Sequence, residues 1–269
     1  MVKNFVSVSG ITDYHQLREV YNIYQKENLN YPLTIGYQVS DKSINQGTQN
    51  PRQPKFSELG DLCQETLNKG FIPAIHYYTR DNEKIPQDME KIVKKGIIPN
   101  SSLVQFNTLP PYSQILKNVK DMGFRIILKV AVSNKQSSEG GYKVWKGEQV
   151  QDVSKGELSP LLDQILSRAD LIDYAMFDAS HGTGLELDLN ENSLAIRFGK
   201  AIIEETSLIN IGIIYAGGIG PSNVKSVVRS LNTFFPKRTS IDSEGKVRID
   251  NRLDLNLVRE YLVGYASAL

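Results

Sequence analysis

The sequence has a single cysteine, a single tryptophan and three histidines among its 269 residues. A lone cysteine, Cys63, cannot form a disulfide within the chain, which is typical of proteins that work in a reducing compartment. So few histidine and cysteine side chains, at scattered positions, do not provide the spacing of a metal site. We therefore expect no disulfide within the chain and no metal site, and we expect Cys63 to be a buried structural thiol.

The chain also lacks an excess of positive or negative charge, and it lacks long apolar runs. The formal net charge is +1, so the chain has no overall field that would attract nucleic acid or an anionic membrane. No stretch reaches the roughly 18 apolar residues that a membrane span needs, and the N-terminal apolar stretch is too short and too polar for a signal peptide. These absences predict a cytoplasmic protein whose partner is neither a nucleic acid nor a membrane.

What the chain does contain is a sustained alternation of strand-like and helix-like segments. Short apolar runs, rich in β-branched residues, predict strands at residues 5–8, 34–39, 72–77, 103–106, 125–132, 174–177, 211–215 and 239–241. Helical periodicity, with capping residues before and glycine or proline stops after, predicts helices at residues 14–26, 57–70, 86–95, 111–122, 160–168, 193–205, 224–231 and 255–265.

This alternation in a chain of 269 residues predicts a (β/α)8 TIM barrel, an α/β fold in which eight parallel strands are ringed by outer helices. We expect one such barrel domain over residues 1–269. The competing fold is an open, doubly wound sheet, which usually has fewer strands and a Gly-x-Gly-x-x-Gly turn after its first strand. The first turn here, residues 8–12, holds a single glycine, which favours the barrel.

Two polar connections, residues 40–55 and 133–156, are longer than the connections of compact domains usually are. Each follows a predicted strand, so both would lie at the catalytic end of a barrel. A lid over the substrate and a flexible insertion are both open interpretations for each segment. For the second segment, a small hairpin through residues 142–145 and 148–150 is a further alternative.

Two glycine-rich turns follow late strands of the expected barrel. In the first, Asp178 ends the strand and Gly182 and Gly184 come after it; in the second, Gly217 and Gly218 follow the next strand. Unobstructed backbone N–H groups and helix N-termini bind phosphate, and many barrels bind it after their last strands. We expect a small phosphorylated ligand here, with Asp178 as a general acid, a helix cap or the partner of a buried lysine.

Three further side chains bear on this site. Lys129, near the end of the fifth strand, either points into the barrel mouth, as an ion-pair partner or substrate contact, or crosses the wall to solvent. His181 lies beside the first glycine turn, and histidine titrates near neutral pH, which suits acid–base chemistry. His76 lies within a strand, where a satisfied core histidine is a more common outcome than a catalyst.

Motifs at the strand ends match one known family in order along nearly all of the chain. Residues 216–224 read Ala-Gly-Gly-Ile-Gly-Pro-Ser-Asn-Val, close to that family's Ala-Gly-Gly-Leu-Asn-Pro-Glu-Asn-Val. Weaker matches lie at residues 8–12, 36–39, 51–54, 104–107, 127–130, 177–184 and 240–245. In these motifs the chain resembles phosphoribosylanthranilate isomerase, a barrel enzyme of tryptophan biosynthesis.

The resemblance implies an acid–base isomerisation, the Amadori rearrangement of a small phosphorylated sugar derivative, with no metal or organic cofactor. Asp178 matches the family's general acid, and Arg52 matches its substrate-contacting arginine. By the same resemblance the phosphate cradle consists of Gly182, Gly184, Gly217, Gly218, Ser243 and Gly245.

Two residues depart from the family's pattern. Ser9 stands where the family has its catalytic cysteine, and a hydroxyl is a far weaker acid than a thiol, so either Ser9 or His181 would serve as the base. Glu244 stands beside the expected phosphate, where the family usually has serine. Two alternatives therefore stay open: a related barrel enzyme that uses Asp178 and Lys129 on a different phosphorylated substrate, and a non-catalytic barrel that binds a phosphate ligand or a partner.

Overall fold

The computed structural model describes residues 4–47, 50–107, 111–131, 142–146, 149–153, 157–178 and 186–269. Its parallel strands lie within two residues of those expected from the sequence. They are β1 (Val6–Ser9), β2 (Leu33–Ser40), β3 (Ile72–Tyr78), β4 (Leu103–Phe106), β5 (Arg125–Ala131), β8 (Tyr174–Asp178), β9 (Gly212–Ala216) and β10 (Thr239–Ser243).

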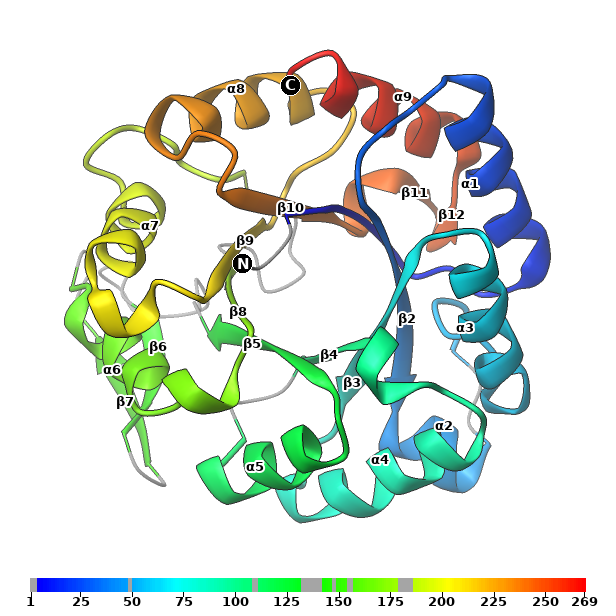
Figure 1. Cartoon of the computed structure of the whole chain (residues 1–269), viewed down its shortest axis with the longest axis horizontal. Helices are drawn as coiled ribbons and strands as arrows, with labels where there is room; N and C mark the ends of the chain where they lie inside the picture. The colour runs from blue at the N-terminus through cyan, green and yellow to red at the C-terminus, as the bar shows by residue number, and fades with distance from the viewer. Residues whose placement is uncertain are drawn as a thin grey trace.

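These strands close into a barrel in the order β1-β10-β9-β8-β5-β4-β3-β2 (Figure 1). Closure depends on β1, which pairs in parallel with β2 on one side and with β10 on the other. The TIM-barrel prediction is therefore confirmed, and the open doubly wound sheet is excluded because the eight barrel strands form a complete ring.

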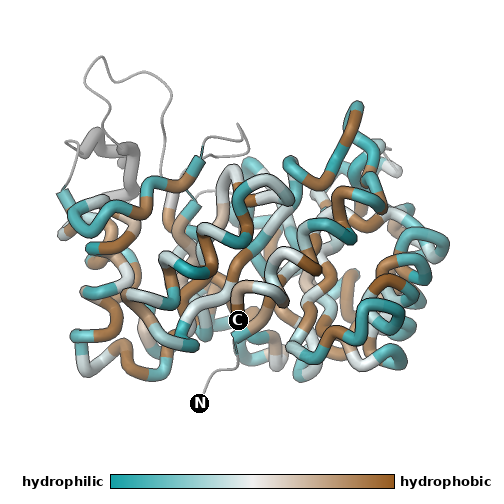
Figure 2. Tube along the Cα trace, turned by 90° about the horizontal axis from the view of Figure 1, so that it is seen from above, coloured by the Kyte–Doolittle hydropathy of each residue, from teal (hydrophilic) through white to brown (hydrophobic). Residues whose placement is uncertain are grey.

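The helices expected from the sequence form a ring outside the strands (Figure 1). They are α1 (Tyr14–Lys26), α3 (Leu59–Asn68), α4 (Ile85–Lys94), α5 (Ser113–Asp121), α6 (Ser159–Leu166), α7 (Leu194–Glu204), α8 (Val224–Phe234) and α9 (Leu255–Ala266). Polar side chains define several of their starts: Asp13 accepts a hydrogen bond from the backbone of Gln16 at the start of α1. Apolar and polar residues alternate along the helices (Figure 2), so each helix has an apolar side for the strands.

Alternation along the strands separates two apolar clusters. The larger one joins outward-facing strand residues to the apolar sides of the helices. The smaller one fills the inside of the barrel, where the rings of Phe5 and Tyr174 meet edge to face with centroids 5.3 Å apart. Its buried members are Phe5, Ala74, Leu103, Ile127, Tyr174, Met176, Ile214 and Ala216.

The two long connections contain regular structure. α2 (Asp41–Gln46) occupies the first part of segment 40–55, where Ser40 and Ser43 form a capping box; the idea that this segment is only a flexible insertion is wrong. β6 (Tyr142–Lys146) and β7 (Gln149–Val153) form an antiparallel hairpin beside α6 (Figure 1). The hairpin interpretation is confirmed, although its second strand is longer than the expected 148–150.

Short elements complete the described chain. β11 (Arg248–Ile249) and β12 (Arg252–Leu253) make a small antiparallel hairpin after β10. Single 3-10 turns are η1 (Phe56–Glu58), η2 (Asn82–Lys84), η3 (Pro99–Ser101), η4 (Ala169–Leu171), η5 (Thr206–Leu208) and η6 (Gly245–Val247).

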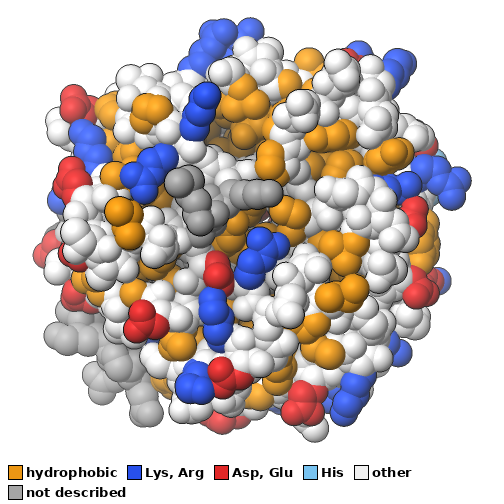
Figure 3. Space-filling view, viewed as in Figure 1, with side chains coloured by type: hydrophobic (Ala, Val, Ile, Leu, Met, Phe, Trp, Pro, Cys, Tyr) orange, Lys and Arg blue, Asp and Glu red, His pale blue; other side chains and the backbone are white. Residues whose placement is uncertain are grey.

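The surface carries no large area of one charge on the face that Figure 3 shows, where acidic and basic side chains are interspersed around the rim. Within the described residues, no helix is long and apolar enough to cross a membrane. Cys63 is buried in α3, as expected, and burial raises the pKa of its thiol, which makes it a poor nucleophile.

Candidate active site

The alternation of strand residues places polar side chains in the barrel mouth. Inside the barrel, Ala74, Ile127 and Met176 are apolar, and the next inward residue on each strand lies two positions further along. Those next residues are His76, Lys129 and Asp178. By the same alternation, Ser9 lies two positions after Ser7 on β1, and Asp242 lies two positions after Ser240 on β10. The inside of the barrel therefore changes from apolar to polar towards the carboxyl ends of its strands.

Lys129 and Asp178 form an ion pair, with 2.5 Å between Nζ and Oδ2. Their side chains are only 15% and 9% exposed, and they project from the neighbouring strands β5 and β8. The ion-pair alternative for Lys129 is thus the one that the structure shows. The pair brings a carboxylate and an ammonium together at one point of the mouth, where solvent screening is reduced.

Ser9 and Asp242 form a second pair on the neighbouring strands β1 and β10. The fully buried Ser9 hydroxyl donates a hydrogen bond of 2.6 Å to Oδ1 of Asp242, and it lies 3.3 Å from the Ser7 hydroxyl. Burial raises the pKa of the Asp242 carboxyl, because the charged form loses water. The hydrogen bonds from the serines and the charge of Lys129 oppose this rise, while the charge of Asp178 adds to it.

His76 lies next to Ser9 across β2. A methyl group added to Gly36 would be 2.3 Å from Ser9 Oγ and 3.0 Å from His76 Nε2, so both side chains meet at this glycine. His76 is 3% exposed, and burial lowers the pKa of its imidazole to about 4. The ring is therefore neutral near pH 7, in agreement with the interpretation of a core histidine.

The turn after β9 is held open by its own side chains. Gly217 and Gly218 adopt left-handed φ angles of 100° and 64°, which glycine tolerates best. Asn223 braces the turn: its Oδ1 accepts from the Gly220 amide at 2.9 Å and its Nδ2 donates to the Gly218 carbonyl at 3.0 Å. α8 begins directly afterwards, so a helix N-terminus and a braced glycine turn lie together.

The turn after β10 lies against the turn after β9. The Ser243 hydroxyl donates to the Ile219 carbonyl at 2.7 Å, and a Cβ added at Gly220 would lie 2.4 Å from Cβ of Lys246. Gly245 is open, with no atom within 4 Å of a Cβ added there. The structure therefore brings together the expected cradle residues of these two turns, whereas His181, Gly182 and Gly184 lie outside the described residues.

Arg52 reaches the same turn from the connection after β2. Its Nη1 is 3.3 Å from Oε1 of Glu244, and its Nε donates to Asn251 Oδ1 at 3.0 Å. Close by, Arg248 donates from Nη2 to the carbonyl of Gly10 at 2.5 Å. Both arginines therefore lie at the edge of the mouth beside β1 and β10, and Glu244 occupies the guanidinium of Arg52.

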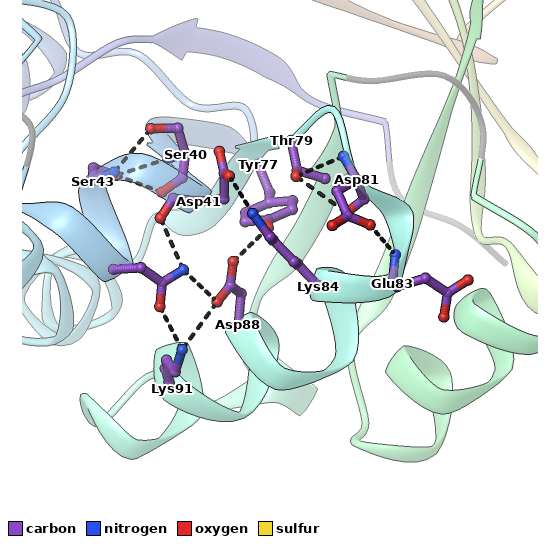
Figure 4. A network of polar contacts seen from close by, with 11 residues as sticks. Ser40, Asp41, Ser43, Tyr77, Thr79, Asp81, Glu83, Lys84, Asp88 and Lys91 are labelled. Atoms are coloured by element: carbon purple, nitrogen blue, oxygen red, sulfur yellow. Dashed lines mark hydrogen bonds and ion pairs between the residues drawn. The ribbon is translucent and has the colours of Figure 1, made fainter.

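Another polar network lies outside the barrel (Figure 4). The fully buried Asp88 of α4 accepts from the hydroxyl of Tyr77 at 2.7 Å and from Asn45 Nδ2 of α2 at 3.0 Å. Lys84 at the start of α4 lies 3.4 Å from Asp41 at the start of α2. This network ties α2 to α4, and its hydrogen bonds and ion pair involve none of the mouth side chains Lys129, Asp178 and Asp242, so we interpret it as structural.

Sequence reasoning found Asp178 and Lys129 but did not select Asp242 or Gly36. Asp242 ends its strand in the same way as Asp178, and that position was the available signal. Its partnership with Ser9 has no sequence signal because the two residues lie 233 positions apart. Among the described residues, no group of three or more histidine, cysteine and carboxylate side chains is placed to hold a metal ion.

Comparison with known proteins points to one family. No family model matches the chain. A curated N-(5'-phosphoribosyl)anthranilate isomerase from Methanococcus aeolicus is 22% identical over 211 residues, which is 78% of this chain and 80% of that protein. The resemblance seen in the motifs is thereby supported.

Solved structures agree with this likeness. Phosphoribosylanthranilate isomerase from Thermotoga maritima superposes with a TM-score of 0.60 at 14% identity, covering 100% of both chains. Another isomerase of this kind, solved with reduced 1-(o-carboxyphenylamino)-1-deoxyribulose 5-phosphate, gives a TM-score of 0.59 at 13% identity over 99% of this chain and 100% of that one. At these identities the superpositions show a shared barrel fold.

Proposed function

We propose that this protein isomerises N-(5'-phosphoribosyl)anthranilate, or a close relative of it, by an Amadori rearrangement in the cytoplasm as a step of tryptophan biosynthesis. The observation that carries the proposal is the Lys129–Asp178 pair in the mouth, at the strand end that the resemblance assigns to the general acid. The name of the Methanococcus relative and the bound sugar phosphate of the solved isomerase support the same substrate class.

In the proposed mechanism the acid side of the mouth opens the sugar. Asp178 passes a proton to the ring oxygen of the furanose, the C1–O bond breaks, and the nitrogen lone pair forms an iminium. The ammonium of Lys129, 2.5 Å away, supplies the proton that the pair gives up. A base then removes the C2 proton, giving an enolamine that becomes the ketone. Proton transfer of this kind contributes about 10²–10⁴-fold to a rate.

The remaining residues bind the substrate. The braced turn at Gly217 and Gly218, with the open Gly245 of the neighbouring turn, offers backbone N–H donors to the phosphate. The Ser243 hydroxyl donates to the Ile219 carbonyl and so holds the two turns together. Gly182 and Gly184 are expected to complete this cradle, and the resemblance leaves His181 or Ser9 as the base. Arg52, at the edge of the mouth, is the group that pairs with the substrate's carboxylate.

A second candidate is a related isomerisation on a different sugar phosphate. Two observations favour it: Ser9 replaces the family's cysteine, and the carboxylate of Glu244 lies at the cradle. On this alternative the Lys129–Asp178 pair and the glycine turns keep their roles, and the substrate lacks the anthranilate ring. A third candidate is a barrel that binds such a ligand without converting it.

One experiment separates these candidates. Purified protein is incubated with N-(5'-phosphoribosyl)anthranilate, and the loss of anthranilate fluorescence is followed for wild type, Asp178→Asn and the control Asp121→Asn, whose carboxylate is 61% exposed on α5. We expect turnover by wild type and the control and a loss of at least about 10²-fold in Asp178→Asn. No turnover of this substrate by ample wild type would exclude the first candidate. Conversion of another sugar phosphate that stabilises the protein would then identify the second candidate, and stabilisation without conversion the third.

A further inference from the structure

Ser9, at the position of the family's catalytic base, is poorly suited to remove a proton from the substrate. Ser9 is fully buried, and its hydroxyl proton is already directed to Asp242 Oδ1 at 2.6 Å. A serine hydroxyl accepts a carbon-bound proton only if it loses its own, and without a partner it is a poor base. Of the two hydrogen-bonded groups, the Asp242 carboxylate is the one that can accept a proton from carbon.

We infer that Asp242 is the catalytic base of this site and that Ser9 is a positioning residue that holds its carboxylate by a hydrogen bond. The inference rests on the proposed isomerisation and adds to it a residue that the family resemblance does not assign. Asp242 projects from β10, two strands away from Asp178 on β8, and Lys129 lies on β5 beyond it. Acid and base therefore come from separate strands of one mouth, with the cradle turn after β9 between them.

The other described candidates are less suitable as the base. His76 is 3% exposed, and burial lowers the pKa of its ring to about 4, so it accepts protons weakly near neutral pH. Asp178 is engaged by Lys129 at 2.5 Å and serves as the acid. Asp242 is buried but, at 9% exposed, is more accessible than His76 at 3% or Asp178 at 6%.

The proton and electrons balance in this step. The C2–H bond of the iminium breaks, its proton forms an O–H bond with the Asp242 carboxylate, and its electron pair forms the C1–C2 double bond. The former double-bond pair between C1 and nitrogen returns to nitrogen, which neutralises the iminium. The resulting enolamine takes a proton at C1 as the C2 hydroxyl loses one, so no oxidant or reductant is needed.

The surroundings of Asp242 suit this role. Ser7 and Ser9 face it from β1, Lys129 from β5, Asp178 from β8 and the hydroxyl of Tyr261 from α9. Burial raises the pKa of Asp242, with Asp178 adding to the rise, while the two serines and Lys129 lower it. A carboxylate of raised pKa is a stronger base than an ordinary aspartate.

The test compares Asp242→Asn with Ser9→Ala, using Asp121→Asn as the surface control. If Asp242 is the base, Asp242→Asn lowers kcat by about 10²–10⁴-fold but binds the reduced product analogue of the solved isomerase within about threefold of wild type. Ser9→Ala loses about tenfold at most. Equal or greater loss in Ser9→Ala, or near-normal kcat in Asp242→Asn, would overturn the inference while wild-type turnover keeps the proposed function.

The pH profile of Ser9→Ala provides a second readout that does not depend on how Asp242→Asn folds. Losing the hydrogen bond that lowers the pKa of Asp242 must raise that pKa, so the acid limb of kcat/KM should move to higher pH. A limb that stays in place or disappears in Ser9→Ala contradicts the assignment. Absence of turnover in wild type would instead remove the proposed function itself.

Discussion

At the scale of single residues, Glu244 is the side chain most at odds with phosphate binding. It lies in the turn after β10, next to the open Gly245, and it pairs with Arg52 at 3.3 Å. Both side chains are partly exposed, at 24% and 37%, so the pair adds little to stability. Under the proposed function its effect would be on binding, since it adds a negative charge near the expected phosphate and pairs with the arginine proposed to contact the substrate.

We therefore expect Glu244→Gln to bind the substrate more tightly. Removing one like charge near a phosphate, at a partly screened site, corresponds to about a three- to tenfold lower KM with little change in kcat. The matched control is Glu260→Gln, an exposed glutamate of α9, which should leave KM unchanged. Weaker binding in Glu244→Gln would mean that the Arg52–Glu244 pair organises the site rather than competing with the ligand.

At the scale of elements, α2 connects the network of Figure 4 to the mouth. This short helix begins the connection that carries Arg52, and Asn45 fixes it to the buried Asp88 of α4 at 3.0 Å. The hydroxyl of Tyr77 on β3 donates to the same carboxylate at 2.7 Å. A single buried group therefore holds a strand and two helices, and one of these helices leads into the segment that carries Arg52.

Asp88→Ala should destabilise the protein by about 2–4 kcal/mol, because it leaves the buried Tyr77 hydroxyl without its acceptor and frees α2. The measurement is chemical denaturation of wild type, Asp88→Ala and the surface control Asp121→Ala. At a temperature where the variant is folded, KM should rise more than kcat falls, since Arg52 is displaced while Lys129 and Asp178 are not. A pure loss of kcat would argue against this connection.

The strands and helices that are determined by residues close together in the sequence could be predicted from it. Buried strands read as continuous apolar runs, and Asp178 stood out because a glycine-rich turn follows it. α2 was missed because its capping box lies in a polar segment without an apolar stripe. The Ser9–Asp242 and Arg52–Glu244 contacts join residues 233 and 192 positions apart, so they exist only once β1 and β10 have closed the barrel.

At the scale of the whole molecule, the barrel encloses titratable groups that an ordinary core would exclude. His76 and Asp242 are both buried at the mouth, and burial lowers the pKa of the imidazole but raises the pKa of the carboxyl. Burial favours the neutral imidazole and the neutral carboxyl alike. Their effects on acid stability therefore oppose each other: protonating His76 disfavours the fold, while protonating Asp242 favours it.

Acid should for this reason destabilise the fold through His76. Its pKa is about 4 in the folded protein against the ordinary value of 6.5 for histidine, so between these values the unfolded chain binds the proton and the native protein does not. The contribution is complete above pH 6.5 and is lost as pH falls through 4, about 3 kcal/mol in all. Denaturation of wild type, His76→Gln and the exposed control His15→Gln at pH 7 and pH 4.5 measures this contribution.

Wild type and His15→Gln should lose more stability on acidification than His76→Gln does, since only His76→Gln lacks the buried group that takes up the proton on unfolding. Equal losses in all three proteins would show that the buried imidazole is already protonated in the native barrel.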